Sequence, residues 1–166
     1  GPARAVQQGW WSLDEGSGTS AADTSGTNNV ATLGAGASWS SPGYNGSGSS
    51  LSVNGGANSY ASTADSGDFD VSNGVTMAFW VHKSADPGAT RGLMSHASGL
   101  SATTGWSVQM NSSGNLIASQ GITGGSGGNN KQVTSTSAVA NGSWVHVAYV
   151  GEVVGGNLTM TIYING

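Results

Sequence analysis

The stretch Val75-Thr76-Met77-Ala78-Phe79-Trp80-Val81 decides the fold class of this chain. Val, Met, Phe and Val alternate in it with Thr, Ala and Trp, and a period of two sends successive side chains to opposite faces of a β-strand. Because neither set is strongly polar, we expect a central strand with both faces wholly or partly covered. The dipeptide Asn73-Gly74 tolerates the positive φ angles of a tight turn, which predicts a reversal immediately before this strand.

Short apolar or alternating runs recur on both sides of this stretch, separated by Gly, Asn, Ser and Pro. No window has the pattern of an amphipathic helix. Several short strands at this spacing predict an all-β fold, a two-sheet antiparallel jelly-roll sandwich. The predicted strands cover residues 10–13, 30–33, 50–53, 60–62, 75–81, 91–96, 105–110, 115–119, 131–135, 144–150 and 158–164.

The composition indicates one domain of an exported protein. The chain has 166 residues, and no break in composition argues for a second domain. Charged residues make up only 7%, so Ser, Thr, Asn and Gly must cover much of the surface, as suits a secreted or cell-surface protein. The 6 Trp, spread from Trp10 to Trp144 among apolar runs, argue against wholesale disorder.

The charge balance argues against nucleic acid and anionic lipid as partners. The formal net charge is −4, and with 4 Lys and Arg in total the chain lacks a patch that could neutralise phosphates. There is no cysteine, which excludes disulfides and cysteine-based metal or redox chemistry. No apolar run approaches the ~18 residues of a membrane span.

Five motifs occur in a fixed order between residues 10 and 166. They are Trp11-Ser12-Leu13-Asp14-Glu15-Gly16-Ser17-Gly18, Ala22-Asp23-Thr24-Ser25-Gly26, Met77-Ala78-Phe79-Trp80-Val81, Trp144-Val145-His146-Val147-Ala148 and Ile162-Tyr163-Ile164-Asn165-Gly166. Together they resemble the concanavalin A-like, laminin G-type jelly roll. More narrowly, they resemble the bacterial version appended to secreted glycoside hydrolases, sialidases, lyases and adhesins.

The resemblance also indicates a shortfall at the C-terminal end. In that family the Tyr-x-Asn-Gly strand is usually followed by further paired strands, whose loss would leave open sheet edges. Three explanations remain open: a piece of a longer protein, a second polypeptide that completes the sandwich, or a shortened fold. We therefore expect residues 9–166 to be a laminin G-like domain, truncated or completed by another segment, and residues 1–8 to be a tag remnant or linker.

The loop at residues 23–29 is a candidate calcium site. Calcium binds six to eight hard oxygens, and a loop containing Gly26 can turn backbone carbonyls inward beside the Asp23 carboxylate and the Asn28 side chain. The resemblance implies a structural calcium here or nearby. The alternative is an Asx-type turn, in which Asp23 accepts hydrogen bonds from backbone N–H groups and no ion is bound.

The other acidic residues do not predict catalysis. Asp65, Asp68 and Asp70 form the densest acidic cluster, which we interpret as a solvated turn; the alternative is a metal site, in which the ion would compensate these like charges. Glycoside hydrolysis needs two carboxyl groups at a fixed separation. Glu15 and Glu152 are the only glutamates, and neither lies in the alternating strand pattern that the superfamily's glucanases use. We therefore expect no enzyme activity.

Aromatic residues near Gly-rich loops are candidate sugar contacts, because a flat ring can stack on sugar C–H groups while polar neighbours bond the hydroxyls. The predicted ligand-binding residues are Trp39, Tyr44, Tyr60, Arg91 and His96, with Asn58 and Gln109 as further donors.

Aromatic residues inside predicted strands are expected in the core instead: Trp80, Trp106, Trp144 and Tyr163. His146 falls on the face opposite to Val145 and Val147, and we interpret it as a packed, hydrogen-bonded histidine.

The sequence thus predicts a non-catalytic carbohydrate-binding or adhesive module of a secreted bacterial protein, with a glycan or cell-surface protein as its partner. The alternative is a protein-interaction or assembly domain completed by strands donated from a partner segment.

Overall fold

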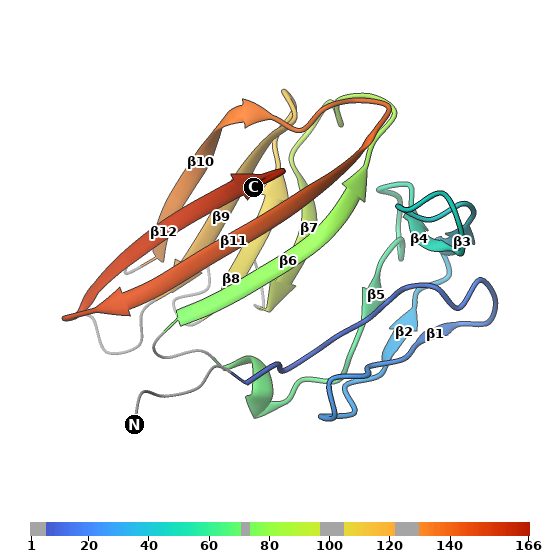
Figure 1. Cartoon of the computed structure of the whole chain (residues 1–166), viewed down its shortest axis with the longest axis horizontal. Coiled ribbons are helices and arrows are strands. Elements are labelled where there is room, and N and C mark those ends of the chain that lie inside the picture. Colours follow the sequence, from blue (N-terminus) through green and yellow to red (C-terminus); the bar gives the residue numbers. More distant parts are fainter. Residues whose placement is uncertain (1–5, 71–73, 97–104, 122–129) are drawn as a thin grey trace. The chain divides into compact units, whose positions relative to one another are not determined.

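The computed structural model of the chain describes residues 6–70, 74–96, 105–121 and 130–166 (Figure 1). Contacts divide the chain into two compact units, unit 1 at Gly1–Phe69 and unit 2 at Asp70–Gly166. In the described ranges the only helix is the 3-10 turn η1 (Gly67–Phe69), and the regular structure is otherwise β. Within those residues no helix has the length and apolar character needed to cross a membrane.

Unit 1 is built from short strands because Gly, Asn and Pro interrupt every apolar run. β1 (Ser20–Ala21), β2 (Ala31–Leu33) and β5 (Ala61–Ser62) form an antiparallel sheet in the order β1-β2-β5. β3 (Ala37–Ser40) and β4 (Ser50–Val53) form a separate antiparallel pair. The strands β1 and β3 were not predicted.

The core of unit 1 is small. Ala21, Ala31 and Leu33 are buried, and larger side chains pack around them, including Trp11 and Trp39. The predicted strand at residues 10–13 is reduced to a single bridge between Trp11 and Asp23. Small central residues bury little apolar surface, so this unit also depends on hydrogen bonds from its loops.

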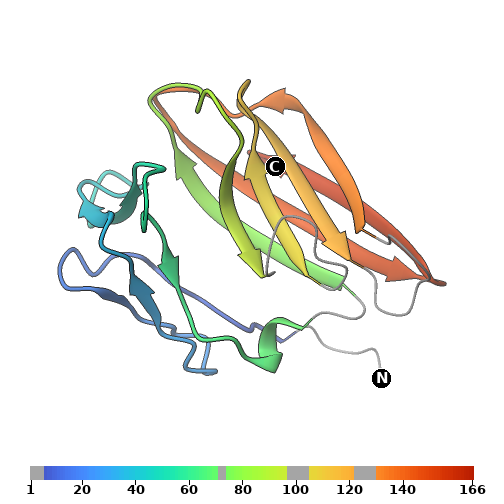
Figure 2. The same cartoon turned by 180° about the vertical axis from the view of Figure 1, so that it is seen from behind.

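Unit 2 is a sandwich of two antiparallel sheets, ordered β12-β11-β6 and β10-β9-β8-β7. Figures 1 and 2 show the two layers from opposite sides. The all-β sandwich prediction is therefore confirmed. The strands are β6 (Gly74–His82), β7 (Arg91–His96), β8 (Trp106–Met110), β9 (Asn115–Gly121), β10 (Asn130–Ala138), β11 (Trp144–Val154) and β12 (Asn157–Ile164).

The prediction that residues 75–81 form a central strand is wrong. In the described part of the chain, β6 pairs with β11 alone and is an edge of its sheet, whereas β11 is central. Thr76, Ala78 and Trp80 are exposed on the outer face of β6. Weakly polar side chains are compatible with a covered face, but they do not require one. The reversal predicted at Asn73-Gly74 cannot be followed, because Asn73 lies outside the described residues.

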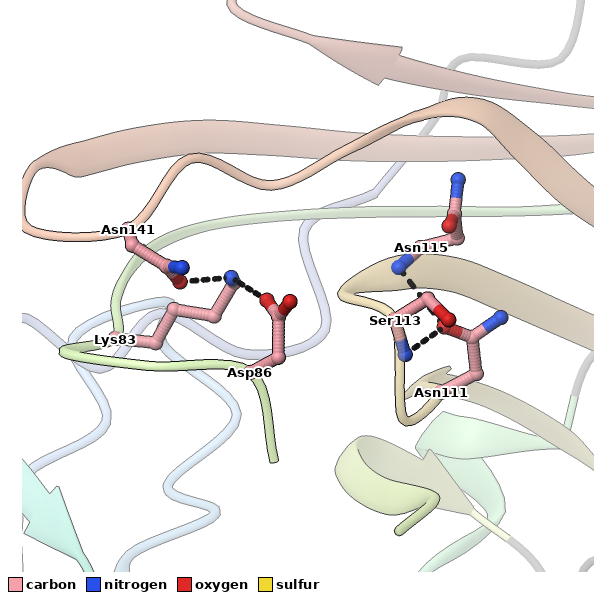
Figure 3. Close-up of polar contacts among 6 residues, drawn as sticks. All are labelled: Lys83, Asp86, Asn111, Ser113, Asn115 and Asn141. Carbon is pink, nitrogen blue, oxygen red and sulfur yellow. Dashed lines mark hydrogen bonds and ion pairs between the residues drawn. The ribbon is translucent and has the colours of Figure 1, made fainter. Parts of the chain in front are cut away.

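Loops at one end of unit 2 are joined by polar contacts (Figure 3). The largely buried Lys83 donates from Nζ to Asp86 Oδ1 at 2.6 Å and to Asn141 Oδ1, which links the loop after β6 to the loop before β11. The Gly142 N–H donates to the Lys83 carbonyl at 2.8 Å. These contacts satisfy polar groups at the point where both chain segments leave the sheet.

The turn between β8 and β9 is closed by its own asparagine. Asn111 Oδ1 accepts the N–H groups of Ser113 at 2.9 Å and Asn115 at 3.0 Å (Figure 3). Gly114, with φ 80°, supplies the left-handed conformation that a β-carbon would disfavour. The turn joins β8 and β9 as an antiparallel hairpin.

The core of unit 2 contains one buried polar pair. Tyr149, from β11, donates from Oη to Gln120 Oε1 of β9 at 2.7 Å, and both side chains are almost fully buried. A β-carbon at Gly151 would overlap both side chains, so this position is restricted to glycine. Burial raises the pKa of Tyr149, which keeps the hydroxyl a donor.

We expect Tyr149→Phe to reduce the free energy of unfolding by about 1–3 kcal/mol, because Gln120 Oε1 loses its partner while remaining buried. Urea unfolding followed by tryptophan fluorescence measures the change. Tyr163→Phe is the matched control, since it removes a hydroxyl from an exposed ring of the same unit. Equal midpoints for Tyr149→Phe and the unchanged protein would contradict this prediction.

Candidate functional site

Five aromatic and imidazole side chains gather on the outer face of the sheet β12-β11-β6. They come from outward positions of its strands, where the period of two places them opposite to the core. We call this set the aromatic face; it consists of Trp80 and His82 from β6, Trp144 and His146 from β11, and Tyr163 from β12.

Two cross-strand pairs organise the aromatic face. His146 lies opposite Trp80, and Trp144 lies opposite His82. The ring centroids of Trp80 and His146 are 5.2 Å apart with an interplanar angle of 61°, and those of His82 and Trp144 are 5.5 Å apart at 50°. Contacts of this kind hold each indole against an imidazole. Trp80 remains 44% exposed.

Tyr163 extends the aromatic face to the third strand. It lies opposite Ala148, whose other neighbour is Ala78, and His146, the partner of Trp80, is two positions before Ala148 on β11. Tyr163 is 45% exposed. The end of β12 is fixed to β11 because the His146 N–H donates to Asn165 Oδ1 at 3.0 Å and the Asn165 N–H donates to the His146 carbonyl at 2.9 Å.

The aromatic face carries almost no formal charge. Among the outward positions of β6, β11 and β12, strands that are described throughout, Glu152 is the only Asp, Glu, Lys or Arg. It lies opposite Gly74 and Thr159, six positions along β11 from His146. This surface is therefore suited to a ligand that combines apolar C–H groups with uncharged polar groups.

The core prediction for the four strand aromatics is right at one position and wrong at three. Trp106 is buried in the core of unit 2, as expected. Trp80 and Tyr163 are exposed, and Trp144 and His146 are half-buried on the same outer face. The alternation in the sequence could have shown this for Trp80. Trp80 is an even number of positions from Thr76 and Ala78, so it lies on their face of the strand and opposite to Met77 and Phe79.

The predicted ligand residues of unit 1 differ in exposure. Trp39 is half-buried against the small core, and its Nε1–H donates to the Gly18 carbonyl at 2.9 Å. Tyr44 and Tyr60 are each 52% exposed. Asn58, at φ 54°, contributes its carbonyl to a bond from the Gly36 N–H at 3.0 Å.

The predicted ligand residues of unit 2 are not brought together. Arg91 and His96 are at the two ends of β7. His96 Nε2 lies 3.3 Å from Asp70 Oδ1, and its ring is 5.9 Å from that of Trp106. Gln109 is buried, with Nε2 donating to Ser107 Oγ at 3.4 Å. The assignment of these residues, and of those in unit 1, to a ligand stays a prediction.

The Asp23 carboxylate is surrounded by hydrogen-bond donors. Oδ1 accepts the N–H groups of Trp10 and Ser25, each at 2.9 Å. Oδ2 accepts from Thr27 Oγ1 at 2.9 Å and from the Asn29 N–H at 2.8 Å. Burial of Asp23 favours a higher pKa, but the hydrogen bonds from Ser25, Trp10 and Asn29 outweigh it and hold the pKa well below its usual range.

This donor set does not fit a calcium ion at Asp23. A carboxylate offers about four lone-pair positions, and hydrogen-bond donors take all of them here. Gly26 and Asn28 are exposed and have positive φ angles of 102° and 61°, which shapes the loop as a turn. Across residues 6–70, 74–96, 105–121 and 130–166, no three His, Asp or Glu side chains form a group able to hold a metal. Calcium binding stays a prediction that requires this loop to rearrange.

The acidic cluster also has specific partners. Asp68 Oδ2 accepts from Asn29 Nδ2 at 3.0 Å and from Ser66 Oγ at 3.3 Å. Asp68 is therefore bonded to specific side chains, whereas the prediction was a carboxylate that contacts solvent alone. Asp70 contacts His96 in unit 2. Glu15 is engaged with the main chain, accepting the Ala22 N–H at 2.8 Å.

Comparison with known proteins supports the fold. A family model described as the concanavalin A-like lectin/glucanases superfamily matches residues 54–166. The chain is also similar to the 2.1 Å crystal structure of residues 221–444 of an S-layer domain-containing protein from Clostridium thermocellum ATCC 27405. That match has 28% identity and a TM-score of 0.58, and covers 95% of this chain and 68% of the other. A search of the curated proteins finds no match.

We expect Asp23→Asn to lower the free energy of unfolding at pH 7 by about 1–3 kcal/mol, because an amide nitrogen replaces an acceptor facing two donors. The native carboxyl has a lowered pKa, so its stabilisation is present above the unfolded value of 3.8 and is lost as pH falls below it. Urea unfolding at pH 7 and pH 3 should therefore show a smaller difference between variant and unchanged protein at pH 3. Asp70→Asn, at an exposed carboxyl, is the control.

The calcium prediction has a separate calorimetric test. An ion held by the native state alone raises the melting midpoint, so the prediction expects a rise with millimolar calcium that a chelator reverses and that Asp23→Asn abolishes. No shift in the unchanged protein would remove the metal assignment.

Proposed function

The chain belongs to the concanavalin A-like lectin/glucanases superfamily, and from that membership we propose that it is a non-catalytic carbohydrate-binding or adhesive module of a secreted bacterial protein. One observation carries the proposal: the aromatic face presents two half-exposed rings, Trp80 and Tyr163, on a rigid sheet. Sites on strands hold their side chains more precisely than sites on loops.

The chemistry of the aromatic face matches that of a sugar. A pyranose ring has an apolar face of C–H groups, which stacks on an indole or phenol ring, and a rim of hydroxyls that need hydrogen-bonding partners. Trp80 and Tyr163 supply the flat surfaces, each with a polar atom at its edge. His82 and His146 add imidazole nitrogens beside the indoles.

The distribution of carboxylates supports binding over hydrolysis. The superfamily's description covers both lectins and glucanases, and a glycosidase needs two carboxyl groups that flank the scissile bond. Glu152 is the only carboxylate on an outward position of the sheet β12-β11-β6, at the opposite end of the ladder from His146. A single carboxylate cannot act as both acid and nucleophile.

The proposed location is the cell surface or the extracellular medium, with a glycan or a cell-surface protein as the partner. The name of the structural relative, an S-layer domain-containing protein, supports this location. The low content of charged residues, 7%, and the net charge of −4 agree with it and disfavour nucleic acid.

The edge strand β12 favours a second candidate, an assembly domain completed by a donated strand. In the described part of the chain β12 pairs with β11 alone. Its inward residues Met160, Ile162 and Ile164 are only half-buried, whereas Val147 and Tyr149 on β11 are fully buried. An apolar edge of this kind is a template for another strand. Sedimentation with and without a peptide of alternating apolar residues tests this candidate. A monomer whose sedimentation does not change when the peptide is added counts against strand donation.

We expect the purified protein to be retained by at least one glycan on an array or by an insoluble polysaccharide. Trp80→Ala should weaken that binding by about tenfold or more, or about 1.4 kcal/mol, because the stacking surface is lost. The comparison variant is Tyr60→Ala, which removes a similarly exposed ring that the sequence predicts as a ligand contact in unit 1. If Tyr60→Ala abolishes binding and Trp80→Ala leaves it unchanged, the ligand site lies in unit 1 and not on the aromatic face.

A further inference from the structure

We infer that Lys83 and Asn141 form an intramolecular amide cross-link, in which Lys83 Nζ replaces the side-chain nitrogen of Asn141 and ammonium is released. Asp86 is the base that activates the lysine. Three observations carry this inference: the polar contacts of Nζ, its enclosure by loops of unit 2, and the main-chain bond that joins the two segments. The cross-link is independent of the proposed function.

The Lys83 amine contacts both groups that the reaction needs. Nζ donates to Asp86 Oδ1 at 2.6 Å and also to Asn141 Oδ1 (Figure 3). The electrophilic carbon of Asn141, Cγ, is one carbonyl bond of about 1.2 Å from that oxygen. A rotation of the Asn141 side chain is therefore sufficient to present Cγ to the amine. A lysine within hydrogen-bond reach of a base has the arrangement of an activated nucleophile.

The main chain keeps the two reacting residues together. Lys83 and Asn141 are 58 positions apart in the sequence. The ladder between β6 and β11 ends at the pair of His82 and Trp144, so both residues lie just beyond it. The Gly142 N–H donates to the Lys83 carbonyl at 2.8 Å, which joins the two loops directly. Reactants held in this way have already lost most of the freedom that a reaction between separate molecules must remove.

The amine is enclosed, whereas the leaving group is not. The Lys83 side chain is 10% exposed. A β-carbon at position 114 would lie 3.1 Å from Nζ and 2.8 Å from Asp86 Oδ1, so the Gly114 turn lies directly against both groups. The Val139 N–H donates to the Gly114 carbonyl at 2.9 Å, which fixes this turn to the segment before Asn141. Asn141 itself is exposed, so ammonium can leave into solvent.

The three side chains supply all the groups that the reaction consumes. Asp86 takes one proton from the Lys83 ammonium, which leaves a lone pair on Nζ. Nζ attacks Asn141 Cγ, so that a Nζ–Cγ bond forms and the carbonyl electron pair moves to Oδ1. When this pair returns, the Cγ–Nδ2 bond breaks, and Nδ2 takes a proton from Nζ and leaves as ammonia. Ammonia then takes the proton that Asp86 holds and departs as ammonium, which restores the carboxylate.

The cross-link gives a chain without cysteine a covalent connection between β6 and β11. Disulfides are excluded because the sequence contains no Cys. In the described part of the chain β6 pairs with β11 alone, so the bond attaches an edge strand to the central strand of its sheet. A cross-link between distant residues also restricts the unfolded chain, which favours the folded state.

Intact-mass spectrometry of the unchanged protein tests the inference. We expect a mass below that of the sequence by one ammonia, about 17 Da. Trypsin cleaves after Lys and Arg but not after an acylated lysine, so residues 5–91 and 132–166 should be recovered as one joined product. A mass equal to that of the sequence, or recovery of residues 5–83 and 132–166 as separate peptides, overturns the inference.

A succinimide at an Asn-Gly sequence also loses one ammonia, and Asn141 precedes Gly142. Mild alkali opens a succinimide by adding water and leaves an amide cross-link intact. Lys83→Arg should abolish the mass loss, because a guanidinium stays protonated and cannot attack. Lys131→Arg is the matched control, at an exposed lysine of the same unit, and should retain the loss. A loss that alkali removes, or that persists in Lys83→Arg, overturns the inference.

Asp86→Asn separates the chemistry from the fold, because it removes the base and keeps the shape of the side chain. It should reduce the cross-linked fraction of freshly purified protein by about tenfold or more. An unchanged fraction overturns the assignment of Asp86 as the base. Circular dichroism of each variant verifies folding, and the mass of the unchanged protein does not depend on any variant.

Discussion

The central strand β11 imposes the constraint on which the rest of unit 2 depends. Val145, Val147 and Tyr149 are buried between the two sheets, while Trp144 and His146 alternate with them on the outside. A slip of one residue in the pairing would exchange the two sets, exposing the core and burying the imidazole. The burial that fixes the register therefore also fixes the aromatic face, because both follow from the same pleat.

Local patterns were sufficient to predict the elements but not their neighbours. The alternation in residues 75–81 and 144–150 predicted two strands that the structure contains. It did not show that the second is central and the first an edge, because strand order depends on contacts between distant segments. Trp106 and Trp80 illustrate the limit: both lie in alternating strands, yet Trp106 shares a face with Val108 and Trp80 with Thr76 and Ala78. A tryptophan an even number of positions from the most apolar residues of its strand lies on the core face, and one an odd number of positions away lies on the outer face.

The site was harder to predict than the fold for the same reason. Tyr163 owes its position on the aromatic face to its pairing with Ala148, and His146 to its pairing with Trp80, and neither pairing can be inferred from one segment. The loop of Asp23 shows a different limit. Its composition suits both an ion and a turn, and the choice depends on where the N–H groups of Trp10 and Asn29 point. The direction of a backbone N–H group cannot be inferred from amino-acid composition.

A surface with so few charges exerts little long-range electrostatic attraction on a ligand. Long-range steering requires a field from clustered charges, and the chain has 4 Lys and Arg and 8 Asp and Glu in total. The proposed stacking on Trp80 and Tyr163 would act only on contact and would be little affected by salt. Two such contacts on one rigid sheet reinforce each other only if a single ligand spans both, because the second contact then forms without a further loss of translational freedom. Under the proposed function, the spacing of the rings, more than their number, would therefore decide which ligands are retained.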